Sequence, residues 1–193
     1  MASDPDRRAA FRDGIEQAID YAGVLNCPRL HIMAGNVPDG LGADAAEAVF
    51  IENLAWAAER LSEAGVVALI EPINPVDMHR YGLGSLAQAE RVLRAVDHPN
   101  LRLQFDFYHM AMMGEALADN FPRLLPVIGH VQFADMPGRH EPGTGVVDFD
   151  AVFAAVEASG YAGWVGAEYR PAAGTREGLG WMLAFPNDIR PDR

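Results

Sequence analysis

Four polar residues that could bind one cation lie near the ends of apolar segments in this 193-residue chain. They are Glu71, Asp106, Gln132 and Glu168, and consecutive members are 35, 26 and 36 residues apart. Each interval is about one strand-and-helix unit, so the four side chains are expected at the same edge of a sheet. Three carboxylates would repel one another there without a cation, and an all-oxygen set suits a hard ion such as Mg²⁺ or Mn²⁺. The residue types therefore predict a magnesium or manganese site, and not a zinc site built from His and Cys.

Two histidines and one arginine are candidates for binding a ligand at this site. His109 follows Asp106 by three residues, just past the apolar segment. His130 precedes Gln132 by two residues, so strand alternation turns both side chains to the same face. Arg139 lies in a loop rich in glycine and proline, which is stiff enough to hold a guanidinium over an anionic ligand. A hydrogen-bonded core histidine is an equal alternative for His130, and an exposed turn is the alternative for Arg139.

Short apolar strands alternate with amphipathic helices along the chain. Strands are expected at 29–35, 65–72, 100–106, 127–135 and 163–169. Helices are expected at 5–23, 44–64, 86–97, 114–124, between Asp148 and Gly160, and at 175–184. Single helices between strands indicate a parallel α/β sheet, either doubly wound or a (β/α) barrel, and both place their chemistry at the carboxyl ends of the strands. With no linker or break in composition, the chain is expected to be one domain over residues 1–193.

The overall composition excludes several classes of function. Lysine and arginine number 15 against 27 aspartates and glutamates, a formal charge of −12 that would repel a nucleic-acid backbone. No apolar run is long enough for a membrane span, and the first residues lack the apolar core of a signal peptide. The lone Cys27 fits a reducing compartment, so we expect a cytoplasmic protein with neither nucleic-acid nor membrane partners. No nucleophile elbow, Walker loop or dinucleotide fingerprint is present.

Four motifs of the chain resemble those of a known enzyme family. They are "LIEPIN" (69–74), "LQFDFYHM" (103–110), "GHVQFADMPGRHEPGTG" (129–145) and "WVGAEYRP" (164–171). They are similar to segments of hydroxypyruvate isomerase and of its relative 2-oxo-tetronate isomerase, within the xylose-isomerase-like TIM-barrel superfamily. The resemblance extends from about residue 7 to residue 182, and the long third motif is the most specific.

The resemblance implies an isomerase that interconverts hydroxypyruvate and tartronate semialdehyde, or acts on a related 2-oxo acid. It implies a divalent metal held by the four strand-end residues. Two of these four, Glu71 and Glu168, also move the proton of the substrate. His109 and Arg139 match positions that bind substrate oxygens. The enediolate between substrate and product carries negative charge, which a metal stabilises. Many relatives have histidine in place of Gln132, which weakens the expected metal affinity here.

The resemblance also implies only part of a barrel. The five strands match strands 4–8 of the family's (β/α)8 TIM barrel, so the single domain is expected to be N-terminally truncated. Five strands alone would leave two parallel edges exposed, so we expect a homo-oligomer that completes the barrel. Two alternatives are a ketose 3-epimerase that uses the same glutamates on a neutral sugar, and a catalytically incomplete fragment. A metallonuclease is disfavoured by the acidic charge.

Overall fold

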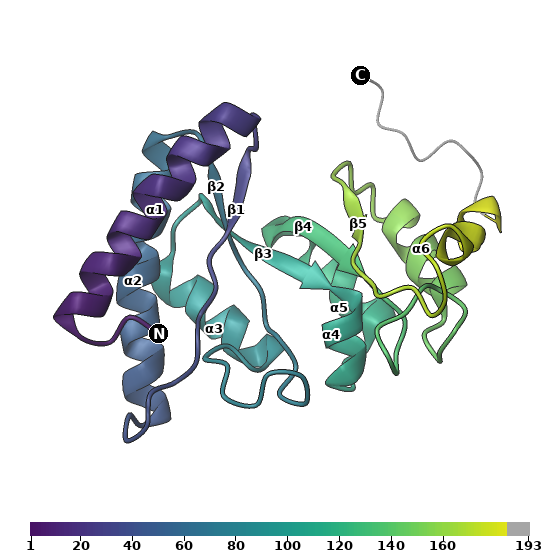
Figure 1. The fold of residues 1–193 in the computed structure, drawn as a ribbon, viewed down its shortest axis with the longest axis horizontal. Helices are drawn as coiled ribbons and strands as arrows, with labels where there is room; N and C mark the ends of the chain where they lie inside the picture. Colours follow the sequence, from purple (N-terminus) through teal and green to yellow (C-terminus); the bar gives the residue numbers. More distant parts are fainter. Residues whose placement is uncertain (185–193) are drawn as a thin grey trace. The chain divides into compact units, whose positions relative to one another are not determined.

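The computed structural model describes residues 1–184 and has an α/β fold (Figure 1). Its strands are β1 (Arg29–His31), β2 (Val67–Ile70), β3 (Leu101–Asp106), β4 (Ile128–Phe133) and β5 (Val165–Ala167). They form one sheet in the order β1-β2-β3-β4-β5, and the pairs β1–β2, β2–β3 and β4–β5 are parallel. A doubly wound sheet would reverse this order at a switch point, whereas a barrel keeps the order of the chain. The expected partial barrel of five βα units is confirmed.

In the described part of the chain, six α-helices and two 3-10 helices accompany the strands. The α-helices are α1 (Pro5–Leu25), α2 (Ala43–Glu63), α3 (Leu86–Val96), α4 (Phe107–Met112), α5 (Leu117–Leu124) and α6 (Phe149–Ala158). The 3-10 helices are η1 (Leu125–Val127) and η2 (Glu177–Ala184). The last segment was expected to be α-helical, but Gly178 and Gly180 lower its helix propensity and it forms η2 instead. Within residues 1–184, no helix is long and apolar enough to cross a membrane.

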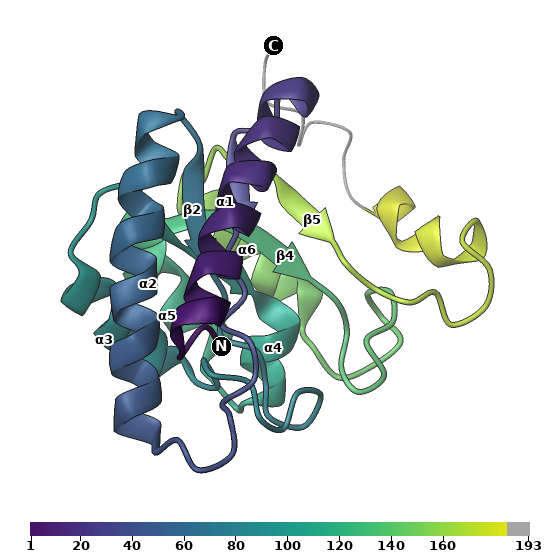
Figure 2. The same cartoon turned by 60° about the vertical axis from the view of Figure 1, so that its left-hand side comes forward.

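The chain forms two compact units, Met1–Gln104 and the part that begins at Phe105. In the first unit, Asp4 caps α1 by accepting a hydrogen bond from the backbone N–H of Arg7 at 2.9 Å. Helix α1 lies along α2 (Figure 2), and the rings of Phe11 and Trp56 meet edge to face with centroids 6.2 Å apart. The buried face of α2 includes Phe50, Leu54, Ala57 and Leu61, which recur at helical spacing. The Asp4 cap and the helical spacing of the apolar residues thus account for the start of α1 and for the buried face of α2.

Aromatic side chains form the core of the second unit. Phe105, Phe107 and Phe121 pack against one another with ring centroids 5.0–5.5 Å apart. Phe133 at the end of β4 meets Phe153 of α6 edge to face at 5.2 Å, and Trp181 of η2 at 5.3 Å. These contacts fasten both helices to the strand and fix the direction in which the chain leaves β4. That the two units form one domain over residues 1–193 stays a prediction.

Candidate functional site

Asp106 is the last residue of β3 and is fully buried. Its carboxylate caps α4 by accepting a hydrogen bond from the backbone N–H of Tyr108 at 2.9 Å. Burial raises the pKa of Asp106 to about 6, against the opposing effects of the Tyr108 N–H and the Arg139 charge. A carboxylate removed from water in this way is stabilised strongly by a cation placed against it.

His109 lies on the same side of α4 as Asp106, because residues three apart are neighbours on a helix. Its side chain is buried, and its Nε2 is 3.7 Å from Oδ2 of Asp106. The sequence placed His109 just past a strand, and the structure places it one turn into a short helix that was not expected. The expected proximity of His109 to the strand-end carboxylate is present within the second unit.

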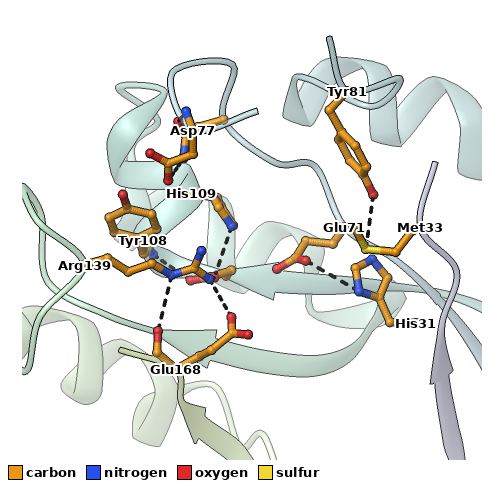
Figure 3. Close-up of polar contacts among 11 residues, drawn as sticks. His31, Met33, Glu71, Asp77, Tyr81, Tyr108, His109, Arg139 and Glu168 are labelled. Atoms are coloured by element: carbon orange, nitrogen blue, oxygen red, sulfur yellow. Dashed lines mark hydrogen bonds and ion pairs between the residues drawn. The ribbon is translucent and has the colours of Figure 1, made fainter. Parts of the chain in front are cut away.

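Arg139 contacts the carboxylates of both Asp106 and Glu168, and Figure 3 shows its contact with Glu168. Its Nη2 is 2.5 Å from Oε2 of Glu168 and 3.4 Å from Oδ2 of Asp106, and its Nε donates to the backbone oxygen of Glu168 at 3.4 Å. The guanidinium also lies 4.9 Å from the ring centre of Tyr108, a cation–π distance. Two carboxylates from different strands therefore converge on one cationic group, which is direct evidence that this cluster accommodates positive charge.

Gln132 and His130 project from β4 toward the neighbouring strand. Gln132 pairs with Gly166 of β5 in the parallel register. A Cβ atom built on Gly166 would lie 3.5 Å from His130 Nε2 and 3.6 Å from Gln132 Cγ. Both side chains thus lie on one face of β4, as strand alternation predicts.

Glu71 belongs to the first unit, where it directly follows β2 and is 4% exposed. His31 at the end of β1 faces it, with Nδ1 3.7 Å from Oε2 of Glu71 (Figure 3). Burial lowers the pKa of His31 to about 4, so the imidazole is neutral near pH 7. Nearby, the hydroxyl of Tyr81 accepts a hydrogen bond from the backbone N–H of Ala34 at 3.0 Å, and burial raises its pKa to about 12. Neutral polar groups therefore surround the Glu71 carboxylate in this unit.

Neither Tyr108 nor Asp135 was predicted at the site. Tyr108 lies under the Arg139 guanidinium, and Asp135 is fully buried at the start of the loop that carries Arg139. A signal for Asp135 existed: an acidic residue directly after an apolar strand and before a glycine-rich loop often accepts hydrogen bonds from that loop. For Tyr108 there was no signal, because the contact depends on the fold of a distant loop.

Comparison with known proteins places these residues in a family. A family model described as a xylose isomerase-like TIM barrel matches residues 1–185. The chain is 41% identical over 185 residues to a 2-oxo-tetronate isomerase of Cupriavidus necator, over 96% of this chain and 71% of the relative. It is 40% identical over 182 residues to a hydroxypyruvate isomerase of Escherichia coli, over 94% of this chain and 70% of the relative. A crystal structure of an AP endonuclease, family 2, from Brucella melitensis superimposes with a TM-score of 0.90 at 36% identity, over 97% of this chain and 72% of that one.

These matches confirm the resemblance that the four sequence motifs indicated. The two curated relatives are both named isomerases, in agreement with the expected class of enzyme. The match also includes all the strands and helices described above. The chain therefore belongs to the xylose isomerase-like TIM barrel family.

Proposed function

We propose that this chain is an isomerase of a small 2-oxo acid and that it interconverts hydroxypyruvate and tartronate semialdehyde. The observation that carries this proposal is the Arg139 guanidinium held against Glu168 and Asp106. An arginine beside the acids is suited to bind a substrate carboxylate, because its planar donors match two carboxylate oxygens. The names of the relatives from C. necator and E. coli support the same class of substrate.

The reaction moves a carbonyl group along a three-carbon acid. A base removes a proton from C3 of hydroxypyruvate, beside the C2 carbonyl, to give an enediolate. The hydroxyl proton passes from the C3 oxygen to the C2 oxygen, and C2 accepts a proton, which leaves the carbonyl at C3. We assign the two proton transfers to the carboxylates of Glu71 and Glu168, which follow β2 and β5 directly. A positioned carboxylate of this kind typically accelerates proton transfer by about 10²–10⁴-fold.

A divalent cation fits the donor groups that the chain supplies. Asp106 is a buried carboxylate with a raised pKa, and the cluster around it already holds the positive charge of Arg139. Glu71, Asp106, Gln132 and Glu168 would hold the ion, an oxygen set suited to Mg²⁺ or Mn²⁺. When bound, such an ion stabilises negative charge that develops on the substrate oxygens.

The remaining residues bind and orient the substrate. Arg139 exchanges its long contact with Asp106 for the substrate carboxylate, while its bond to Glu168 keeps the guanidinium near the reacting carbons. His109, which faces Asp106, donates to a substrate oxygen. His130 lies beside Gln132 on β4 and lines the same face.

Proton exchange in D₂O tests the proposal. The purified chain with Mn²⁺ is expected to incorporate deuterium at C3 of hydroxypyruvate, followed by NMR, and to leave a neutral ketose such as D-fructose unchanged. Exchange on the ketose alone would favour the 3-epimerase alternative. The absence of exchange on both would favour an incomplete catalytic site. An endonuclease activity, as the name of the B. melitensis structure indicates for that protein, is opposed here by the charge of −12.

A further inference from the structure

We propose that Asp135 is a positioning residue that fixes the loop of residues 136–147 and, through it, the guanidinium of Arg139. This inference rests on the proposed function, because Arg139 is the residue assigned to the substrate carboxylate. Asp135 itself lies outside the reacting groups: it is fully buried two residues beyond β4.

The carboxylate of Asp135 accepts four backbone hydrogen bonds from its own loop. Oδ1 accepts from the N–H groups of Met136 at 2.8 Å and Val147 at 3.1 Å. Oδ2 accepts from the N–H groups of Gly143 at 2.9 Å and Gly145 at 2.8 Å. One side chain thus joins the first residue of the loop to three residues near its end, and closes the segment that carries Arg139 into a ring.

The close approach of the loop to the carboxylate requires glycine at position 145. A Cβ atom built there would lie 2.6 Å from Oδ1 of Asp135 and would also overlap the backbone oxygen of Met136. The loop is held further by the N–H of Val146, which donates to the oxygen of Met136 at 2.8 Å. The backbone and the carboxylate therefore specify a single loop conformation together.

The closed loop fixes the position of Arg139. The backbone N–H of Asp135 donates to the oxygen of His140 at 2.8 Å, which anchors the residue that follows Arg139. Arg139 has a φ of 56°, in the left-handed region that a residue other than glycine rarely adopts. On the other side, the N–H of Arg170 donates to the oxygen of Arg139 at 2.8 Å. The backbone of Arg139 is thereby held between the Asp135 loop and the segment after β5, which directs its side chain to Glu168.

The geometry requires a carboxylate and not merely a polar side chain. All four partners of Asp135 are N–H donors, and an ionised carboxylate is the one side-chain group of this size that only accepts. Asparagine would replace one oxygen by an NH₂ group that faces two donors. Two hydrogen bonds would be lost and two buried N–H groups would be left without partners, a costly arrangement.

The first test is limited proteolysis of the full chain by trypsin, which cleaves after arginine. In Asp135→Asn, cleavage between Arg139 and His140, identified by mass spectrometry, is expected to be about tenfold faster than in the wild type. The matched control is Asp148→Asn, which alters a carboxylate that caps α6 through one bond to Ala151. Unchanged cleavage after Arg139 in Asp135→Asn would overturn the proposal, whether or not the chain proves to be an isomerase.

Kinetics with hydroxypyruvate test the link to Arg139. Asp135→Asn is expected to raise KM about tenfold with kcat within about threefold, and to have no further effect on KM in an Arg139→Gln background. Additive effects of the two substitutions on KM would show a merely structural role and overturn the proposal.

If Asp135→Asn does not fold, Gly145→Ala opens the same loop without changing the carboxylate and is expected to give the same two results. A wild-type chain that does not act on hydroxypyruvate contradicts the proposed function, and the proteolysis then decides the role of Asp135 alone.

Discussion

The guanidinium of Arg139 and the carboxylate of Glu168 form a short ion pair, with Nη2 2.5 Å from Oε2. The same nitrogen lies 3.4 Å from Oδ2 of Asp106. Arg139 thus occupies two of the carboxylates that we assign to a divalent ion, and it competes with that ion for them. The effect of the Arg139 charge can therefore be measured through metal binding alone, without an activity assay.

Removal of this charge is expected to tighten metal binding. Arg139→Gln should bind Mn²⁺ about tenfold more tightly than the wild type in calorimetric titrations, because a positive charge a few ångströms from the ion is lost. Arg94→Gln provides the control, since it removes a largely exposed charge from α3 that pairs with Glu90. Equal or weaker Mn²⁺ binding by Arg139→Gln would contradict the shared use of Asp106 and Glu168.

Glu168→Gln is expected to abolish the interconversion of hydroxypyruvate and tartronate semialdehyde. The amide keeps the shape of the side chain but can neither accept nor deliver the substrate proton, and the interconversion needs both proton transfers, so its rate should fall by about 10²–10⁴-fold. Glu157→Gln, an exposed position on α6, is the matched control and should convert hydroxypyruvate at the wild-type rate. A residual rate above one tenth of the wild-type rate would contradict the role of Glu168 in proton transfer.

Asp106→Asn is expected to stabilise the metal-free chain at neutral pH. The folded pKa of Asp106, about 6, lies above its ordinary value of 3.8, so the folded state binds more protons between these limits. The Asp106 carboxyl group therefore stabilises the folded wild type at low pH. This contribution, about 3 kcal/mol at most, is lost as the pH rises through 6. Urea denaturation in EDTA should show the variant more stable at pH 7.5 and closer to the wild type at pH 4.5. A variant less stable than the wild type at pH 7.5 would show instead that the Asp106 carboxylate stabilises the folded chain.

His31→Gln should change the pH dependence of stability in the opposite sense. Burial holds the pKa of His31 at about 4, below its ordinary value of 6.5, so the unfolded state binds more protons between these limits. The wild type should lose stability from this group as the pH falls from 6.5 to 4, by on the order of 2 kcal/mol given its partial exposure. Urea denaturation across this range should give a shallower acid loss for His31→Gln, whereas His79→Gln, at an exposed position, should follow the wild type. Identical profiles for His31→Gln and the wild type would mean that folding does not lower the pKa of His31.

Much of the fold follows from local signals in the sequence. Asp4 and Ser85 accept from the backbone N–H groups of Arg7 and Gln88, so both predicted helix starts are correct. The strands are shorter than the apolar runs that predicted them; β1 covers three residues where seven were expected. The apolar runs are longer than the hydrogen-bonded strands because residues that flank the strands, such as Ile32 and Ala34, are also buried.

The candidate site was predictable only in part. The spacing of acids along the chain located Asp106 and Glu168, because parallel strands bring their carboxyl ends to one edge. The pairing of Arg139 with both acids was not predictable, since it depends on the closure of a twelve-residue loop around Asp135. Helix α4 was missed because "FYHMAM" is too short to show a helical period, and its start is set by the Asp106 cap.

The cap that Asp106 provides has an evolutionary consequence. The residue that ends β3 and binds charge also begins the helix that carries His109, through the bond from the N–H of Tyr108. A mutation to a residue that cannot cap, such as alanine, would disturb the start of α4 and the charge of the site at once. Asparagine is the nearest sequence change that keeps the helix, and it removes the charge. Under the proposed function, a lineage that retains the activity must keep aspartate at this position, whereas a lineage without the activity is expected to gain stability by the single substitution to asparagine.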